Sequence, residues 1–215
     1  MEFRLTPEEE SLRKKVEAFV NEELIPLEPL FDGAPDIFEG SRWKSRARLS
    51  KDPEVKRYIG IMETLEEKAE ARGLWYLDVP KEYGGLQVSN VAMIVVTEEL
   101  EKTSVPFELG NHVSNILYAC KGDQIETFLL PCLRGEKTAC FGLTEPGAGS
   151  DPSMLTTTAT PDGGYFVLNG SKMFPTFADV ADFAQVFARL PGTKGHEGVT
   201  CFLVETGTPG YRVVR

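Results

Sequence analysis

In the first part of the chain, hydrophobic residues recur every three or four positions, which is the spacing of an amphipathic helix. Residues 6–9, Thr-Pro-Glu-Glu, have the pattern of a capping box with Thr6 as the N-cap, and apolar residues follow at positions 12, 16, 19 and 20. The pattern predicts a helix that begins at Pro7. Pro26 and Pro29 are expected to end it, because the residue before a proline avoids helical dihedral angles.

The same spacing predicts further helices downstream. One covers about residues 53–72, with Gly73 as a plausible C-terminal cap. Another follows Ser89 or Asn90 and contains VAMIVV (91–96). Its β-branched residues could favour a strand, but the continuation TEELEKT favours a helix, and apolarity on all sides indicates a buried one. A last helix opens with Asp123 and Glu126.

After residue 138 the hydrophobic pattern changes to a period of two, which is typical of strands. Short segments rich in Thr, Val, Phe and Tyr alternate with turns, at 138–143, 155–160, 165–168, 171–174, 182–188, 199–204 and 211–214. Asn169-Gly170 is a residue pair that suits a type I′ hairpin turn, and residues 161–164 and 190–198 are further turns. The predicted fold class is α+β multidomain. An all-α domain over 1–137 precedes an antiparallel, barrel-like β domain over 138–215.

Composition narrows the possible functions. The chain of 215 residues is long enough for two domains, and its net charge of −10 argues against nucleic acid as a partner. The acidic start lacks the features of a signal peptide, and the longest apolar run (91–96) is too short to span a bilayer, so a soluble, cytoplasmic protein is expected. Four cysteines without a C-x-x-C pair and only two histidines, His112 and His196, predict free thiols and no metal site.

The segment between residues 31 and 56 contains several basic residues and is also rich in Gly, Pro and Ser. Arg42, Lys44, Arg46 and Arg48 could bind an anionic ligand or partner. A solvated surface excursion is the simpler interpretation, because alternating charged residues usually face water.

The segment LTEPGAGSD (143–151) is the strongest candidate for a binding loop, because glycine-rich loops with a hydroxyl can cradle phosphate through backbone N–H groups. It is only half of a G-x-G-x-x-G motif, with proline at position 152 and no helix expected after it. No Gly-Lys-Ser/Thr follows, so a P-loop does not fit either. On shape alone, a structural turn between two strands is an equal alternative.

A wider comparison of motifs identifies a family. ACFGLTEPGAGSD, followed some two dozen residues later by YFVLNGSKMFPT, resembles the acyl-CoA dehydrogenase family, as do VPKEYGGLQVS (79–89) and LLPCLRGEK upstream. The resemblance covers nearly the whole chain apart from residues 31–56. It implies FAD as the cofactor, an acyl-CoA thioester as the substrate, and oxidation of its Cα–Cβ bond with hydride transfer to the flavin N5.

The resemblance also implies roles for residues of the first motif. Phe141, Leu143 and Thr144 would lie along the flavin ring, and Ser150, with Gly149 beside it, would reach the flavin pyrophosphate. Ser150 is also a weaker candidate for substrate binding. Each residue also has a purely structural alternative. Phe141 and Leu143 could be core residues, and Ser150 with Asp151 could cap a turn.

In the second motif, Phe174 takes the place of an aromatic residue, usually Trp, beside the flavin ring, and Thr176 matches a hydroxyl near N5. Pro175 and Phe177 depart from the family pattern. Pro175 has no N–H to donate to the flavin, and Phe177 adds bulk, so the flavin pocket is expected to be altered.

Glu145 and His112 are two further candidates for roles in the site. Glu145 resembles a structural carboxylate of the family and is not expected to be catalytic. His112 stands in a segment resembling one that lines the acyl pocket, although a packed or surface histidine is the simpler interpretation.

The resemblance places the catalytic glutamate beyond residue 215, in a C-terminal helical bundle that is absent from these residues, so no catalytic residue is predicted here. The chain is therefore expected to be an N-terminal portion, or a short subunit of a homo- or hetero-oligomer, with an electron-transfer flavoprotein as electron acceptor. Two alternatives stay open: a non-catalytic partner subunit or interaction module, and a related flavin oxidase or monooxygenase.

Overall fold

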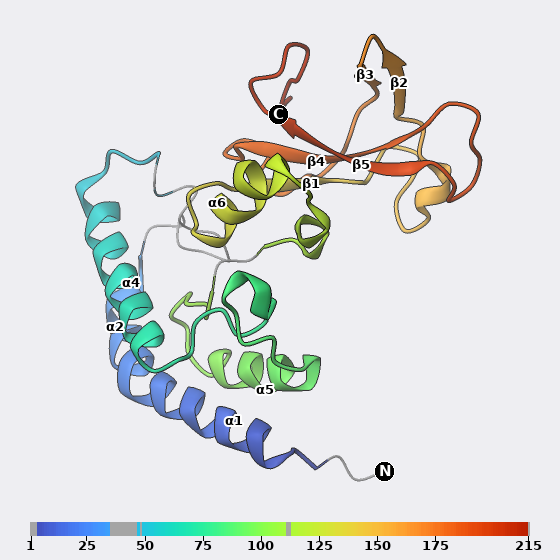
Figure 1. The fold of residues 1–215 in the computed structure, drawn as a ribbon. Helices are drawn as coiled ribbons and strands as arrows, with labels where there is room; N and C mark the ends of the chain where they lie inside the picture. Colours follow the sequence, from blue (N-terminus) through green and yellow to red (C-terminus); the bar gives the residue numbers. More distant parts are fainter. Residues whose placement is uncertain (1–3, 35–46, 48, 111–112, 215) are drawn as a thin grey trace. The chain divides into compact units, whose positions relative to one another are not determined.

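The computed structural model describes residues 4–34, 47, 49–110 and 113–214 (Figure 1). The chain forms two compact units, Met1–His112 and Val113–Arg215. The basic residues Arg42, Lys44, Arg46 and Arg48, and also His112, lie outside the described residues. The expected domain boundary after residue 137 stays a prediction.

The first unit begins with helix α1 (Pro7–Phe19), which has the predicted capping box. The Glu9 N–H donates to Thr6 Oγ1 at 3.2 Å, and the Thr6 N–H donates to Glu9 Oε2 at 2.9 Å. These bonds satisfy backbone donors that have no partner inside the helix. The start of the helix is therefore confirmed at Pro7.

The predicted end of this helical run at the two prolines is wrong. The chain continues without a break through a π turn, η1 (Val20–Leu24), a 3-10 turn, η2 (Ile25–Leu27), and α2 (Glu28–Phe31). Pro26 and Pro29 each stand in the first turn of a new segment, where a missing N–H costs nothing. The Asp32 N–H still donates to the Glu28 carbonyl at 3.0 Å.

A π turn precedes an interior proline in both units. The Ile25 N–H donates to the Val20 carbonyl, and in the second unit the Leu130 N–H donates to the Ile125 carbonyl, so each bond reaches five residues back. In both places the next residue is a proline, which has no N–H and whose ring would collide with the carbonyl four residues earlier. The wider turn accommodates that ring without ending the helix.

Helix α4 (Pro53–Ala71) confirms the second predicted helix. Asp52 caps its start by accepting the Glu54 N–H at 2.8 Å. Gly73 follows its end with φ of +67°, and the Leu74 N–H donates to the Ala69 carbonyl at 2.9 Å. This is the left-handed C-terminal cap for which glycine is suited.

Helix α5 (Asn90–Leu100) is confirmed, with Ser89 as its N-cap, but the expectation that all its sides are buried is wrong. Its Ala92 N–H donates to Ser89 Oγ at 3.0 Å. Within the unit, Val91 is 45% and Ile94 67% exposed, whereas Glu99 is buried. Glu99 accepts bonds from Arg13 of α1 at 3.4 Å and from Lys102 at 2.6 Å, so the face toward α1 carries an ion pair and the apolar residues lie partly on the surface of this unit.

The second unit contains a five-stranded sheet, and the helical turns over 125–133 pack on it (Figure 1). The strands are β1 (Ala139–Gly142), β2 (Thr158–Asp162), β3 (Tyr165–Asn169), β4 (Phe183–Arg189) and β5 (Val199–Glu205). The helical turns are η6 (Ile125–Leu129) and α6 (Leu130–Leu133). The rings of Phe128 and Phe183 lie 4.8 Å apart and join η6 to β4.

A helical region followed by a β domain is confirmed, but the sheet is mixed and not closed into a barrel. Its order is β1-β4-β2-β3, with β5 on β4. The β2/β3 and β4/β5 pairs are antiparallel, whereas β1/β4 and β2/β4 are parallel. The prediction of an antiparallel domain fails at the two parallel pairs. Parallel neighbours need a long crossover, which the segment between β1 and β4 supplies.

The turn predicted over residues 161–164 is confirmed, and it connects β2 to β3 as a hairpin. Gly163 and Gly164 have φ of +53° and +91°, and Asp162 pairs with Tyr165 across them. Two consecutive positive φ angles are what a two-residue hairpin turn with the right twist needs, and two glycines meet this without strain. The hairpin predicted at Asn169-Gly170 is therefore wrong.

Two of the segments predicted as strands, 171–174 and 211–214, are not strands in the structure. The turn predicted over 190–198 is confirmed as the connection from β4 to β5. The segment over 171–174 instead runs beside the glycine loop, where it helps to form the candidate site.

Candidate functional site

The glycine loop is a tight turn that follows β1. The Glu145 N–H donates to the Ala148 carbonyl at 2.8 Å, and the Ala148 N–H returns a bond to the Glu145 carbonyl at 3.2 Å. Pro146 and Gly147 form the tip between them and are exposed. The loop thus has the geometry of a tight turn.

Glu145 is the buried centre of this loop, with its side chain 2% exposed. Its Oε2 accepts the N–H and the hydroxyl of Thr156, both at 2.7 Å, and its Oε1 accepts the Thr157 N–H at 3.0 Å and Lys172 Nζ at 2.7 Å. Burial alone would raise the pKa of Glu145, but these hydrogen bonds outweigh burial and hold that pKa well below its usual range. Glu145 is thus a charged structural group, consistent with the role expected for it.

Lys172 joins the second motif to this loop. Its Nζ donates to the Leu143 carbonyl at 3.1 Å and to Glu145 Oε1 at 2.7 Å, and the Met173 N–H donates to the Thr144 carbonyl at 2.8 Å. Burial lowers the pKa of Lys172, and the hydrogen bond and charge of Glu145 oppose that shift. The two sequence motifs therefore lie side by side, joined by a buried ion pair.

The residues predicted to contact a cofactor surround this junction. Phe141 is 44% and Phe174 81% exposed, and the Phe141 ring lies 4.9 Å from the Phe187 ring. Phe141 is therefore not a core residue, and Leu143 is half-buried. Within the part of the chain that the structure describes, no protein group bonds to the hydroxyls of Thr144, Ser150 and Thr176. The junction thus offers aromatic rings and open hydroxyl donors together.

The end of the glycine loop is capped by Asp151 and not by Ser150. Asp151 Oδ1 accepts the Ser153 N–H at 2.9 Å at the start of η7 (Pro152–Met154). Hydrogen bonds from Ser153, with a smaller contribution from the charge of His196, hold the pKa of Asp151 below its usual range. Gly149 and Ser150 are exposed, so the hydroxyl and backbone of this pair are open to a ligand.

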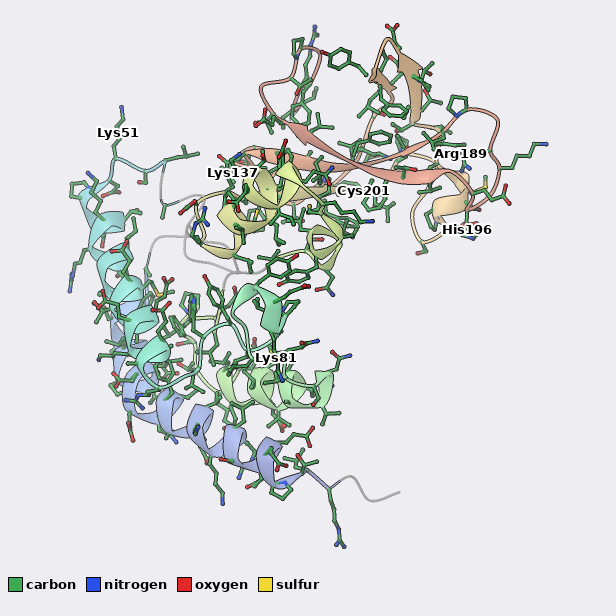
Figure 2. The ribbon with its side chains drawn as sticks, in the orientation of Figure 1. Lys51, Lys81, Lys137, Arg189, His196 and Cys201 are labelled. Carbon is green, nitrogen blue, oxygen red and sulfur yellow. The ribbon has the colours of Figure 1, made fainter. Side chains whose placement is uncertain are left out.

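Arg189, which no sequence motif singled out, links the segment before β2 to the loop between β4 and β5. Its Nη2 donates to the Ser153 carbonyl and its Nη1 to the Gly195 carbonyl, both at 2.7 Å. Longer bonds of 3.3 Å reach the carbonyls of Leu155 and Glu197. Figure 2 shows Arg189 close to His196 in the β4–β5 loop. One guanidinium thus fixes both loops.

The backbone of the second motif is strained at two aromatic residues. Phe174 and Phe177 have φ of +56° and +67°, in the left-handed region that is costly for bulky side chains. They bracket Pro175 and Thr176. Such strain commonly marks functional sites, where the surrounding structure holds an unfavourable conformation in place.

We expect Phe174→Asn to raise the free energy of unfolding by about 1 kcal/mol, because asparagine tolerates a positive φ and the phenylalanine ring is largely exposed. Urea denaturation would measure this. Tyr165→Asn is the matched control, since Tyr165 is 79% exposed but lies in strand β3 with an ordinary φ. An equal gain from both variants would show that strain at Phe174 is not the cause.

The described residues contain no cluster of metal-ligating side chains, and none of their helices is long and apolar enough to cross a membrane. The cysteines are free: Cys120, Cys132 and Cys140 are buried, and Cys201 is half-buried.

Two family models match the chain. They describe the N-terminal domain of acyl-CoA dehydrogenase, at residues 46–136, and its middle domain, at residues 140–215. The chain belongs to the acyl-CoA dehydrogenase family. The resemblance drawn from the motifs is confirmed, and the candidate site lies within the matched middle domain of this acyl-CoA dehydrogenase family member.

Individual relatives support the same family. The chain is 32% identical over 219 residues to a short-chain specific acyl-CoA dehydrogenase from Clostridium acetobutylicum, covering 99% of the chain and 52% of the relative. It is 34% identical over 163 residues to the caffeyl-CoA reductase–Etf complex subunit CarC from Acetobacterium woodii, covering 73% and 43%. This family member thus spans about half the length of the curated relatives it matches.

A solved structure of glutaryl-CoA dehydrogenase from Mycobacterium smegmatis in complex with FADH2 has a similar fold. The TM-score is 0.61 at 26% identity, and the match covers 96% of this chain and 47% of that chain. The fold of this acyl-CoA dehydrogenase family member is therefore shared by a protein that holds a reduced flavin.

Proposed function

We propose that this chain is the flavin-binding portion of an acyl-CoA dehydrogenase, which oxidises the Cα–Cβ bond of an acyl-CoA thioester. The observation that carries the proposal is the junction of residues 143–145 with 172–173, which leaves the rings of Phe141 and Phe174 and the hydroxyls of Thr144 and Thr176 open to a ligand. Family membership and the relative that holds FADH2 support it.

The residues of the junction fit a flavin by their chemistry. Phe141, Leu143 and Phe174 offer apolar surface to a flat aromatic ring, and Thr144 and Thr176 offer donors to its polar edge. Pro175 between them offers no N–H. Gly149 and Ser150 offer a backbone N–H and a hydroxyl to a pyrophosphate. When bound, the flavin would supply the acceptor for the hydride.

No residue of the chain is assigned as the catalytic base. Glu145 is unsuited to that role, because four donors occupy its oxygens and its pKa lies well below the usual range. We propose that the base belongs to a further segment or subunit, and that the 215 residues alone are inactive. An electron-transfer flavoprotein is the proposed electron acceptor, by analogy with the Etf complex named for the relative CarC.

We expect the chain to bind FAD, and Thr144→Val to weaken that binding about fivefold, because one hydrogen bond contributes about 1 kcal/mol. Titration of FAD, followed by quenching of its fluorescence, would measure this. Thr160→Val is the matched control, because Thr160 is exposed on β2, outside the junction. Failure of the wild-type chain to bind FAD would contradict the proposal, as would equal losses in both variants.

A second candidate function is a non-catalytic partner subunit that keeps the fold without the cofactor. The strained Phe177 and the missing donor at Pro175 favour it, because both alter the proposed pocket. It predicts a stable complex with a dehydrogenase chain on size exclusion and no FAD uptake by this chain. An oxidase or monooxygenase on the same scaffold is distinguished by oxygen consumption during turnover of the completed enzyme.

A further inference from the structure

Lys172 holds the residues on both sides of Thr144. Its Nζ lies 3.1 Å from the carbonyl oxygen of Leu143 and 2.7 Å from Oε1 of Glu145. The next residue, Met173, donates its N–H to the carbonyl of Thr144 at 2.8 Å. Three consecutive residues of the glycine loop are thus each bonded to residues 172–173, which fixes the orientation of the Thr144 peptide.

The Glu145 carboxylate extends this connection to a third segment. On its other side it accepts the N–H groups of Thr156 and Thr157 and the hydroxyl of Thr156. The carboxylate therefore joins the glycine loop, the segment before β2 and the second motif at one point. Neutral side chains of similar size would not make the same set of charged hydrogen bonds.

Burial makes this ion pair rigid. The side chains of Lys172 and Glu145 are 10% and 2% exposed. A buried charge without a partner is strongly unfavourable, so each of the two holds the other in its place. The side chains of Phe174 and Thr144 are not held by contacts of this kind. The Phe174 ring is largely exposed, and the Thr144 hydroxyl bonds to no described protein group.

We propose that Lys172 is a positioning residue: its ammonium group, paired with Glu145, sets the spacing and orientation of Thr144 and Phe174 as the two sides of the flavin site. Lys172 acts through these residues and does not itself touch the cofactor. The inference rests on the proposed flavin site, but the positioning of the loop can be measured without FAD.

The test compares Lys172→Met with the wild-type chain by amide hydrogen exchange. Methionine keeps much of the length of the side chain and removes its charge. We expect exchange of the Met173 and Thr157 amides to rise at least tenfold, while amides in the β4–β5 ladder, Phe183–Arg189 with Val199–Glu205, stay protected. FAD affinity should fall at least tenfold in the same variant.

Lys137→Met is the matched control. Lys137 donates to the Thr127 carbonyl at 3.0 Å, so this variant also loses a lysine-to-carbonyl bond in the same unit, away from the glycine loop. We expect its Met173 and Thr157 amides and its FAD affinity to match those of the wild type. Equal effects of both variants would overturn the proposal.

The outcomes separate the two proposals. Local loosening in Lys172→Met together with weaker FAD binding supports the positioning role. If exchange rises equally in the β4–β5 ladder, or if FAD affinity is unchanged, Lys172 is not a positioning residue for the cofactor. If the wild-type chain binds no FAD at all, the proposed function fails, and the role in flavin positioning fails with it, while the exchange data still show whether Lys172 orders the loop.

A second variant covers the case in which Lys172→Met does not fold. Glu145→Gln keeps an oxygen that can accept from Thr156 or Thr157 and removes the charge that pairs with Lys172. We expect the same local rise in exchange of the Met173 amide and a weaker affinity for FAD. Unchanged exchange and affinity in Glu145→Gln would overturn the proposal.

Discussion

Replacing Gly170 by alanine is expected to lower the free energy of unfolding of the second unit by about 3 kcal/mol. A β-carbon at Gly170 would lie 2.3 Å from Thr157 Oγ1 and 2.7 Å from Thr157 Cα. Atoms this close must separate, and the Cα belongs to the backbone, so the movement cannot be confined to a side chain. Equilibrium denaturation in urea would measure the loss.

The loss at Gly170 should be large because Thr157 is held from two directions. Its N–H donates to Glu145 at 3.0 Å, and its carbonyl accepts the Arg189 N–H at 2.8 Å. A shift of Thr157 would weaken both bonds. Gly147→Ala is the matched control, because no atom of the described residues, its two chain neighbours aside, lies within 4 Å of a β-carbon at that position. Similar losses in the two variants would contradict the steric explanation.

Arg189→Lys is expected to destabilise the second unit by a similar amount, about 3 kcal/mol, although the charge is kept. The guanidinium donates from three nitrogens to four carbonyls, two on each of two loops. One ammonium group cannot reach all of them, so at least two carbonyls lose a charged donor. Thermal and urea denaturation of the variant would measure the effect.

Arg134→Lys serves as the control for Arg189. Arg134 is 49% exposed and pairs with Glu136 at 2.7 Å, and the Glu136 side chain is 55% exposed. Exposed ion pairs contribute less than about 1 kcal/mol, so this variant should change stability little. A loss equal to that of Arg189→Lys would show that the link between the two loops does not determine the effect.

The helix starts could be predicted from the sequence because caps are local. Thr6 and Ser89 each bond to an N–H three residues later, and Gly73 adopts the positive φ that its place after a helix requires. The path through Pro26 could not be predicted, because a π turn depends on the fit of a proline ring to one carbonyl and not on the hydrophobic period.

Strand pairing was predicted less well, because it depends on residues far apart in the sequence. The parallel register of Phe141 with Gln185 and of Thr158 with Arg189 leaves no local signal. The hairpin prediction failed for a related reason. Gly170 resembles a turn residue in the sequence, but the fold needs a glycine there because any side chain would collide with Thr157.

The candidate site was predicted as two motifs, and the structure supplies the bonds between them. The sequence singled out Thr144 and Phe174, but it assigned no role to Lys172 and gave Glu145 no partner. Lys172 stood in a segment predicted as a strand, where its side chain would alternate with its neighbours. Only the fold shows that its ammonium group meets a carboxylate 27 residues earlier in the chain.

The two π turns have a consequence for the evolution of the chain. A π turn contains one residue more than the α-helical turn it replaces, so each can arise by a single-residue insertion. Relatives that lack a proline at the position of Pro26 or Pro131 have no proline ring in the helix at that point. An ordinary α-helical turn, one residue shorter, is then sufficient. Alignment gaps of one residue should therefore occur within 20–24 and 125–129, together with the loss of the proline that follows.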